Sequence, residues 1–143
     1  MSKAVIVYWS ETGNTKVMAE AIKYGMATAG TEADLVEVSA IEPAKALEYD
    51  HIALGCPSMG AEVLEETEFQ PFYDELSKSL GGKKIALFGS YGWGDGEWMR
   101  VWQDEVSNAG ANLYNGEGLM VNYTPDEDGV AQCKSFGEGF AKY

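Results

Sequence analysis

The chain of 143 residues has few of the side chains that bind metals or perform nucleophilic catalysis: two cysteines, Cys56 and Cys133, and one histidine, His51. The cysteines lie far apart and form no Cys-x-x-Cys pair, so neither a metal site nor a dithiol couple is indicated. Buried free thiols in a reducing cytoplasm are expected instead. A single histidine excludes a multi-histidine metal centre and a triad built on histidine. The sequence therefore predicts a cytoplasmic protein without a metal.

Long apolar runs and basic side chains are also scarce. The longest apolar stretches are only strand-sized, and residues 1–3 lead directly into the first of them, so we expect neither a membrane span nor a signal peptide. Ten lysines and arginines stand against 23 aspartates and glutamates, which gives a net charge of −13. No basic stripe exists for a nucleic-acid backbone, so nucleic acid is not an expected partner. The excess acid favours protein partners with basic faces, or serves solubility alone.

Strand-length apolar runs alternate with helical patterns along the whole chain. The runs that predict strands cover residues 4–8, 33–38, 51–55, 84–88 and 112–121, the last with an interruption at 116–118. The patterns that predict helices cover residues 16–29, 43–49, 66–80, 97–109 and 126–142. The inward side chains expected on two of these helices are Phe69, Phe72, Tyr73 and Leu76, and Trp98, Val101, Trp102 and Val106. This order predicts one α/β domain over residues 1–143, with a five-stranded, doubly wound parallel sheet and helices on both faces.

The segment between the first strand and the first helix is rich in hydroxyl groups: Ser10, Glu11, Thr12, Gly13, Asn14 and Thr15. The first N–H groups of a helix have no internal partners and carry the positive end of its dipole, so they attract anions. No lysine or arginine lies in this segment. We therefore expect it to hold a static phosphate monoester by dipoles and hydroxyls. The alternative is an ordinary helix N-cap. Neither a Gly-x-x-x-x-Gly-Lys-Ser/Thr loop nor an opening Gly-x-Gly-x-x-Gly is present.

Two further loops follow strands whose carboxyl ends meet at the same edge of a parallel sheet, where ligands of such folds bind. Residues 56–62 follow the third strand and residues 90–96 the fourth, and both are rich in glycine. Each loop carries one large polarizable side chain, Met59 or Trp93, and the two could enclose a planar ring between them. A phosphate site beside such a clamp predicts a phosphorylated planar cofactor. The alternative for Trp93 is a packing residue.

At these residues the sequence resembles the flavodoxins, specifically the short-chain kind from anaerobic bacteria. The first motif fits from Ile6 to Ile22, and the segments 59–62 and 90–94 resemble the other two flavin loops of that group. The similarity extends over essentially the whole chain. It implies a flavodoxin-like sheet with strand order 2-1-3-4-5.

The resemblance also implies non-covalent FMN, with its phosphate on residues 10–15. Trp93 would stack on one face of the ring and Met59 would lie against the other. Glu62 would accept a hydrogen bond from the flavin N3–H. Gly60 would supply a carbonyl that turns towards N5 on reduction, for which the Met59–Gly60 peptide is the candidate.

Two residues depart from the pattern of the family. Pro57 stands where many relatives have a serine that contacts the cofactor, so that hydroxyl is expected to be either missing or replaced by Ser58. Ala61 stands where Asp or Ser is frequent, so redox potentials are not carried over. The residues expected at the cofactor site are Ser10, Glu11, Thr12, Gly13, Asn14, Thr15, Pro57, Ser58, Met59, Gly60, Glu62, Ser90, Tyr91, Gly92, Trp93 and Gly94.

The function that the resemblance implies is a low-potential one-electron carrier, not an enzyme, that shuttles its flavin between semiquinone and hydroquinone among redox partner proteins. The alternative is an FMN-dependent reductase of a small substrate such as a quinone. A receiver-type signalling domain is excluded, because Leu54, Gly55 and Cys56 provide no acceptor aspartate at the end of the third strand.

The segment 61–77 borders the expected flavin edge and contains no lysine or arginine. Its acidic residues are Glu62, Glu65, Glu66, Glu68, Asp74 and Glu75. We expect this acidic face to dock basic faces of redox partners, with attraction that steers their encounter. The protein itself is expected to be a monomer.

Overall fold

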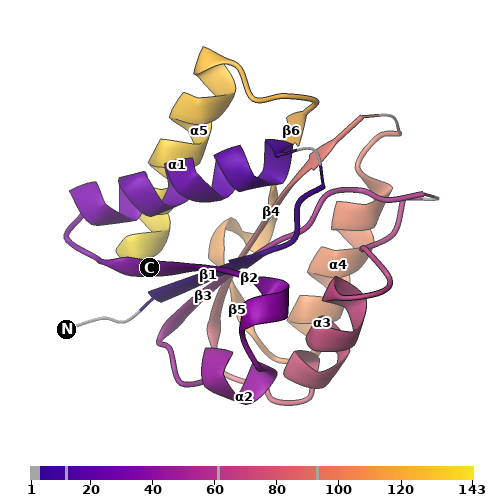
Figure 1. Ribbon diagram of the computed structural model, residues 1–143. Coiled ribbons are helices and arrows are strands. Elements are labelled where there is room, and N and C mark those ends of the chain that lie inside the picture. The colour runs from indigo at the N-terminus through magenta and orange to yellow at the C-terminus, as the bar shows by residue number, and fades with distance from the viewer. Residues whose placement is uncertain (1–3, 12, 61, 93) are drawn as a thin grey trace.

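The computed structural model describes residues 4–11, 13–60, 62–92 and 94–143 (Figure 1). A parallel sheet runs through its centre and consists of β1 (Ala4–Tyr8), β2 (Ala33–Glu37), β3 (His51–Gly55), β4 (Lys84–Tyr91), β5 (Asn112–Leu113) and β6 (Leu119–Asn122). The strand order is β2-β1-β3-β4-β5, and β6 also pairs with β4. The predicted order 2-1-3-4-5 is therefore confirmed, with the fifth position divided between two short strands.

The division of the fifth strand falls where the sequence predicted an interruption. A 3₁₀ turn over Tyr114–Gly116 separates β5 from β6, and the two successive left-handed residues Asn115 (φ 64°) and Gly116 (φ 69°) interrupt regular strand geometry. β5 pairs with the start of β4, and β6 pairs with its last four residues, 88–91. This second pairing also explains why β4 continues beyond Phe88, the end predicted for it.

Helices cover both faces of the sheet, as predicted (Figure 1). They are α1 (Asn14–Thr28), α2 (Pro43–Ala46), α3 (Phe69–Ser77), α4 (Glu97–Asn108) and α5 (Glu127–Ala141). Because successive strand residues point to opposite faces, Val5 and Val7 of β1 join the core under α3 and α4, whereas Ala4 and Ile6 join the core under α1 and α5.

Two details of the helix predictions were wrong. The helix expected over 66–80 covers only Phe69–Ser77, because the Glu65 carboxylate accepts the N–H groups just before the helix and its first N–H. Val101 was expected to point inward but is 49% exposed, and Met99 is buried instead. At 100° per residue, the buried Val106 extends the stripe of Trp98 and Trp102 towards Met99, so Val101 lies outside it on the opposite side.

Candidate flavin site

The three predicted loops meet at the carboxyl edge of the sheet around one cavity of about 260 Å³. Its lining residues are Ser10, Glu11, Asn14, Thr15, Pro57, Ser58, Met59, Ser90, Tyr91, Gly92 and Tyr123. All of these except Tyr123 belong to the predicted set. Gly13, Gly60, Glu62 and Gly94 lie in the same loops but do not line the cavity. Thr12 and Trp93 lie outside the described residues, so stacking by Trp93 stays a prediction.

The start of α1, where the sequence predicts a phosphate site, forms part of the cavity wall. Gly13 precedes the helix with a φ of 96°, which a residue with a side chain adopts only under strain. The Ser10 hydroxyl accepts the N–H of Gly13 at 3.1 Å and that of Lys16 at 3.4 Å. Asn14 lies beside them and accepts a hydrogen bond from Thr124 at 3.0 Å. A hydroxyl and an amide thus surround the helix N-terminus, as a phosphate site without a cation requires.

The inner wall joins α1 to the end of β4 through two buried hydroxyls. The side chains of Thr15 and Ser90 lie 3.0 Å apart, and the N–H of Ser90 lies 3.4 Å from the Thr15 hydroxyl. The N–H of Ser58 donates to the Ser90 carbonyl at 3.0 Å, so the second loop is fixed to the same point. All three predicted segments are therefore held together here by hydrogen bonds.

The turn at residues 59–63 bears on which carbonyl could respond to reduction. Met59 and Val63 exchange two backbone hydrogen bonds, with the Met59 N–H donating at 2.8 Å and its carbonyl accepting at 3.0 Å. The carbonyl of the Met59–Gly60 peptide is thus already engaged by Val63, and it cannot turn towards a ligand without losing that bond. The carbonyl of Gly60 itself, at the start of a turn with φ 47°, is the remaining candidate. Ala61 lies outside the described residues.

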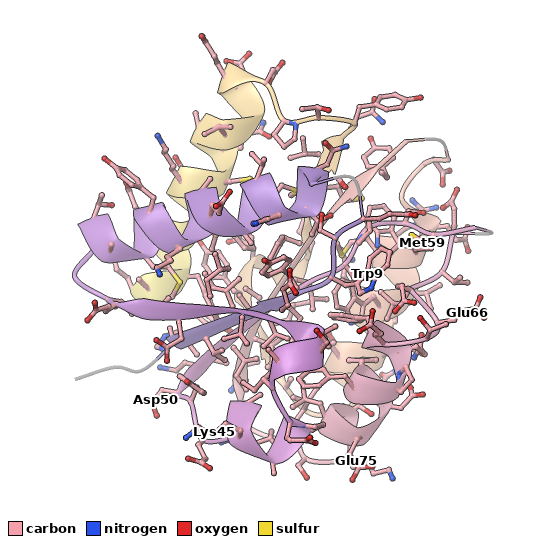
Figure 2. All side chains as sticks on the ribbon, viewed as in Figure 1. Trp9, Lys45, Asp50, Met59, Glu66 and Glu75 are labelled. Carbon is pink, nitrogen blue, oxygen red and sulfur yellow. The ribbon has the colours of Figure 1, made fainter. Side chains whose placement is uncertain are left out.

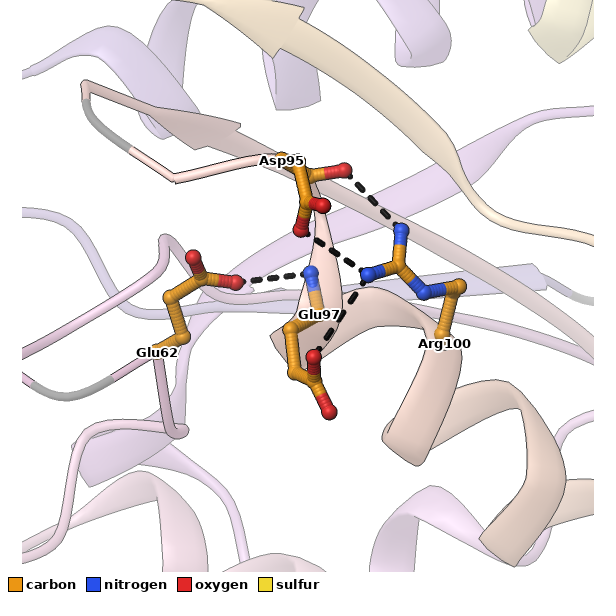
Figure 3. A network of polar contacts seen from close by, with 4 residues as sticks. All are labelled: Glu62, Asp95, Glu97 and Arg100. Carbon is orange, nitrogen blue, oxygen red and sulfur yellow. Dashed lines mark hydrogen bonds and ion pairs between the residues drawn. The ribbon is translucent and has the colours of Figure 1, made fainter.

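Glu62 links two loops of the site (Figure 3). Its carboxylate accepts the N–H of Glu97, the first residue of α4, at 2.7 Å. A side chain at Gly94 would collide with the same carboxylate, so the two loops are in close contact. Glu62 itself has a φ of 57°, unusual for a residue other than glycine. The sequence predicted a ligand contact for this carboxylate but not its bond to a helix N-terminus 35 residues away.

One wall of the cavity, the loop with Asn122 and Tyr123, was not predicted from the sequence. The Asn122 side chain donates to the carbonyls of Tyr91 and Gly92 at 3.0 and 3.2 Å. The N–H of Tyr123 donates to the Tyr91 carbonyl at 2.7 Å, and its ring, which lines the cavity, is 61% exposed. This loop follows β6 and ends at the same sheet edge as the others. The rule that carboxyl ends of parallel strands meet would have found it.

Two buried groups behind the cavity are not available for chemistry. Burial raises the pKa of the Cys56 thiol to about 12, and its sulfur accepts the N–H of Glu65 at 3.3 Å. Glu65 was expected on the acidic face but is buried. Burial raises the pKa of its carboxyl, but hydrogen bonds from the Thr67 hydroxyl and from nearby N–H groups outweigh this and leave the pKa below its usual value. Glu65 is therefore a structural anion.

The donor set fits a phosphorylated planar group. The cavity is lined by Ser10 and Asn14 at a helix N-terminus and by Met59, Tyr91 and Tyr123. No group of three or more cysteine, histidine or acidic side chains arranged to bind a metal occurs among the described residues. In the same part of the chain, no helix has the length and apolar character needed to cross a membrane.

A parallel sheet in the order 2-1-3-4-5, with this cavity at the edge where the winding reverses, defines a doubly wound α/β protein of the nucleotide-binding class. The family model described as Flavodoxin matches residues 6–137. The flavodoxin of Clostridium beijerinckii is 46% identical over 95% of this chain and 97% of its own length. That of Megasphaera elsdenii is 42% identical, and its two-electron reduced solution structure has a TM-score of 0.88 over 98% of this chain and 99% of that one. The chain belongs to the flavodoxin family.

Family membership confirms three predictions: the short-chain resemblance, the fold and the carrier function. The protein is a flavin-containing one-electron carrier that acts with redox partner proteins, and it is not an enzyme. These relatives give no support to the alternative of a reductase that acts on a small substrate.

Proposed function

We propose that the flavin is FMN, bound without a covalent link in the cavity at the carboxyl edge of the sheet, and that residues 1–143 form a single FMN-binding domain. FMN supplies the one-electron chemistry, and the chain supplies binding, orientation and electrostatics. The observation that carries this proposal is the start of α1, where Ser10, Asn14 and Thr15 line the cavity around the first N–H groups of the helix. Thr12 is assigned to this phosphate site because it lies in the hydroxyl-rich segment 10–15.

The proposal for the ring is supported by Met59, Tyr91 and Tyr123, which line the cavity. Trp93 is proposed to cover the flavin ring because of its place in the glycine-rich loop 90–96. The cavity of about 260 Å³ is slightly below the ~300 Å³ at which closed ligand pockets begin, so part of a bound FMN would remain outside it. An exposed cofactor edge suits a protein that passes electrons to other proteins rather than to a substrate held inside.

The residues beside the cavity bear on how easily the cofactor accepts electrons. The Glu62 carboxylate places a negative charge in this region, and like charges repel, so it opposes the negative charge that a second electron adds. The Gly60 carbonyl can accept a hydrogen bond from a ring nitrogen that gains a proton on reduction. Together these groups favour the first reduction step and oppose the second.

The partners are proposed to be redox proteins with basic docking faces. Without the buried Glu65, the exposed acidic residues of the segment are Glu66, Glu68, Asp74 and Glu75. Glu66 lies on the same side of the molecule as Met59 (Figure 2), so a docked partner would face the cofactor edge. We further propose a monomer in a reducing cytoplasm, in which the free thiols of Cys56 and Cys133 persist.

The test is a titration of the apoprotein with FMN, riboflavin and FAD, followed by flavin fluorescence. FMN should bind far more tightly than riboflavin, because riboflavin lacks the phosphate that the start of α1 holds. As a matched variant, Ser10→Ala should weaken FMN binding by about 0.5–1.5 kcal/mol, the net value of one hydrogen bond, and leave riboflavin binding unchanged. Equal affinity for FMN and riboflavin would exclude this segment as the phosphate site.

A further inference from the structure

Arg100 is the only arginine in a chain of net charge −13, and it lies beside the loops of the flavin site. Its guanidinium donates twice to Asp95: Nη1 to the backbone carbonyl at 3.0 Å and Nη2 to the carboxylate at 2.9 Å. Nη2 also lies 3.5 Å from the carboxylate of Glu97 (Figure 3). The Arg100 side chain therefore connects Asp95, two positions before α4, with Glu97 in the first turn of that helix.

We call these contacts of Arg100 with Asp95 and Glu97 the clamp. The backbone of residues 94–96, which the clamp holds, has an unusual conformation. Asp95 lies between Gly94 (φ 88°) and Gly96 (φ 95°), both in the left-handed region. Glycine has no steric preference for this conformation over others, so the sequence alone does not fix it. Arg100 donates hydrogen bonds to both the backbone carbonyl and the carboxylate of Asp95, and these bonds fix the backbone of Asp95 between the two glycines.

The backbone N–H of Glu97, the residue that follows this segment, is directed towards the Glu62 carboxylate. This group is the first N–H of α4, it carries the positive end of the helix dipole, and it donates to the Glu62 carboxylate at 2.7 Å. A hydrogen bond to an ionised acceptor is among the stronger ones in proteins. The Glu62 carboxylate is thus bonded to the start of α4, and Arg100 contacts the residues on either side of that start.

A role in overall stability does not account for this cluster. The side chains of Arg100 and Asp95 are 53% and 80% exposed, and exposed ion pairs add little to the free energy of unfolding. We propose that Arg100 is a positioning residue of the flavin site: it fixes the start of α4 and, through the Glu97 N–H, holds the Glu62 carboxylate beside the cavity. This inference rests on the proposed function only in placing the flavin at that cavity.

The test compares two variants with opposite changes in charge: Arg100→Gln removes the clamp, and Asp95→Asn weakens it by removing the ionised acceptor while the backbone carbonyl of Asp95 stays in place. Arg100→Lys keeps the positive charge but loses the bidentate hydrogen bonding to Asp95. Lys45→Gln removes a positive charge from α2, far from Met59 in Figure 2, and serves as the control. The readouts are the dissociation constant of FMN, both reduction potentials, and hydrogen exchange of the Glu97 amide in the apoprotein.

Both clamp variants should bind FMN about two- to tenfold more weakly, the equivalent of one net hydrogen bond, and their Glu97 amides should exchange faster. Arg100→Lys should lie between them and the unchanged protein, and Lys45→Gln should match the unchanged protein. All should unfold at nearly the same temperature. FMN affinities or second potentials that move in opposite directions in Arg100→Gln and Asp95→Asn would show an effect of charge alone and overturn the inference, as would affinities that do not change.

Failure of the unchanged protein to bind FMN would instead overturn the proposed function. Exchange of the Glu97 amide in the apoprotein would still decide whether Arg100 holds the start of α4, because this measurement needs no cofactor. An exchange rate that is the same in Arg100→Gln and in the unchanged protein would exclude the clamp.

Discussion

Replacement of Glu65 tests how the start of α3 is stabilised. The Glu65 carboxylate is buried and accepts a hydrogen bond from the Thr67 hydroxyl. It also accepts three backbone N–H groups at the start of α3, those of Thr67, Glu68 and Phe69, at 2.8, 2.7 and 2.8 Å. One buried anion thus satisfies donors that the helix cannot satisfy itself. In Glu65→Ala all of them lose their acceptor.

The size of the effect follows from which donors water can reach. Thr67 and Glu68 are exposed, so water can replace the carboxylate at their N–H groups, but Phe69 is fully buried. One hydrogen bond to a charged acceptor that water cannot replace is worth ~1.5–3 kcal/mol. We therefore expect Glu65→Ala to lower the free energy of unfolding by about 2–3 kcal/mol. For a chain of this length, ~3–4 °C per kcal/mol gives a fall in Tm of about 6–12 °C.

The effect should depend on pH in a definite direction. The pKa of Glu65 lies below its usual value in the folded protein, so its ionised form stabilises the fold above the unfolded-state pKa of ~4.3. This stabilisation is lost as the pH falls through the folded-state pKa. Glu65→Gln keeps one acceptor oxygen but no charge, so its deficit should be largest near neutral pH and should shrink below pH ~4.

Urea or thermal unfolding of the apoprotein over a pH series measures these differences, and Glu66→Ala is the matched control. Glu66 is the neighbouring acidic residue and is exposed, so its removal should change little. The reasoning is refuted if Glu65→Ala is no more destabilising than Glu66→Ala, or if the deficit of Glu65→Gln grows on acidification.

Three further predictions concern electron transfer. Gly60→Val should resist the left-handed turn (φ 47°) and shift the first reduction potential negative by about 20–65 mV, the equivalent of ~0.5–1.5 kcal/mol; an unchanged potential would place the responding carbonyl elsewhere. Glu62→Gln keeps an acceptor for the Glu97 N–H but removes the charge, so the second potential should become less negative in a redox titration; a more negative value would contradict the repulsion argument. Stopped-flow transfer to a basic partner should slow as salt shortens the screening length from ~10 Å at 0.1 M to ~3 Å at 1 M, and a flat rate would exclude steering.

Local patterns sufficed for the sheet, the helices and three of the four loops around the cavity. Strand-length apolar runs and helical spacing depend on near neighbours in sequence, and the rule on strand ends then places Ser10, Met59 and Ser90 together. What could not be predicted depends on contacts across the fold. In the sequence, Glu65 is one acid among several; its hydrogen bonds to residues 67–69 are local, but its burial follows from the packing of α3 against the core.

The partner of Glu62 was missed for the same reason. Its hydrogen bond reaches the N–H of Glu97, and nothing near either residue in the sequence indicates the other. The contribution of Tyr123 was missed because the loop after the divided fifth strand has no motif comparable to the glycine-rich loops. These are long-range consequences of a topology that the sequence did indicate.

The divided fifth strand also determines where the chain could be lengthened. β5 and β6 pair with separate parts of β4, so the register of one does not depend on the other. Between them, residues 115–117 are exposed, and the N–H of Gly118 donates to the Gln103 side chain at 2.8 Å, which fixes the return to β6. Exposed turns of this kind tolerate inserted sequence best. A peptide or a whole domain inserted at 115–117 would leave both strand pairings and the flavin loops in place, so the carrier could be fused to another protein through its middle rather than through its ends.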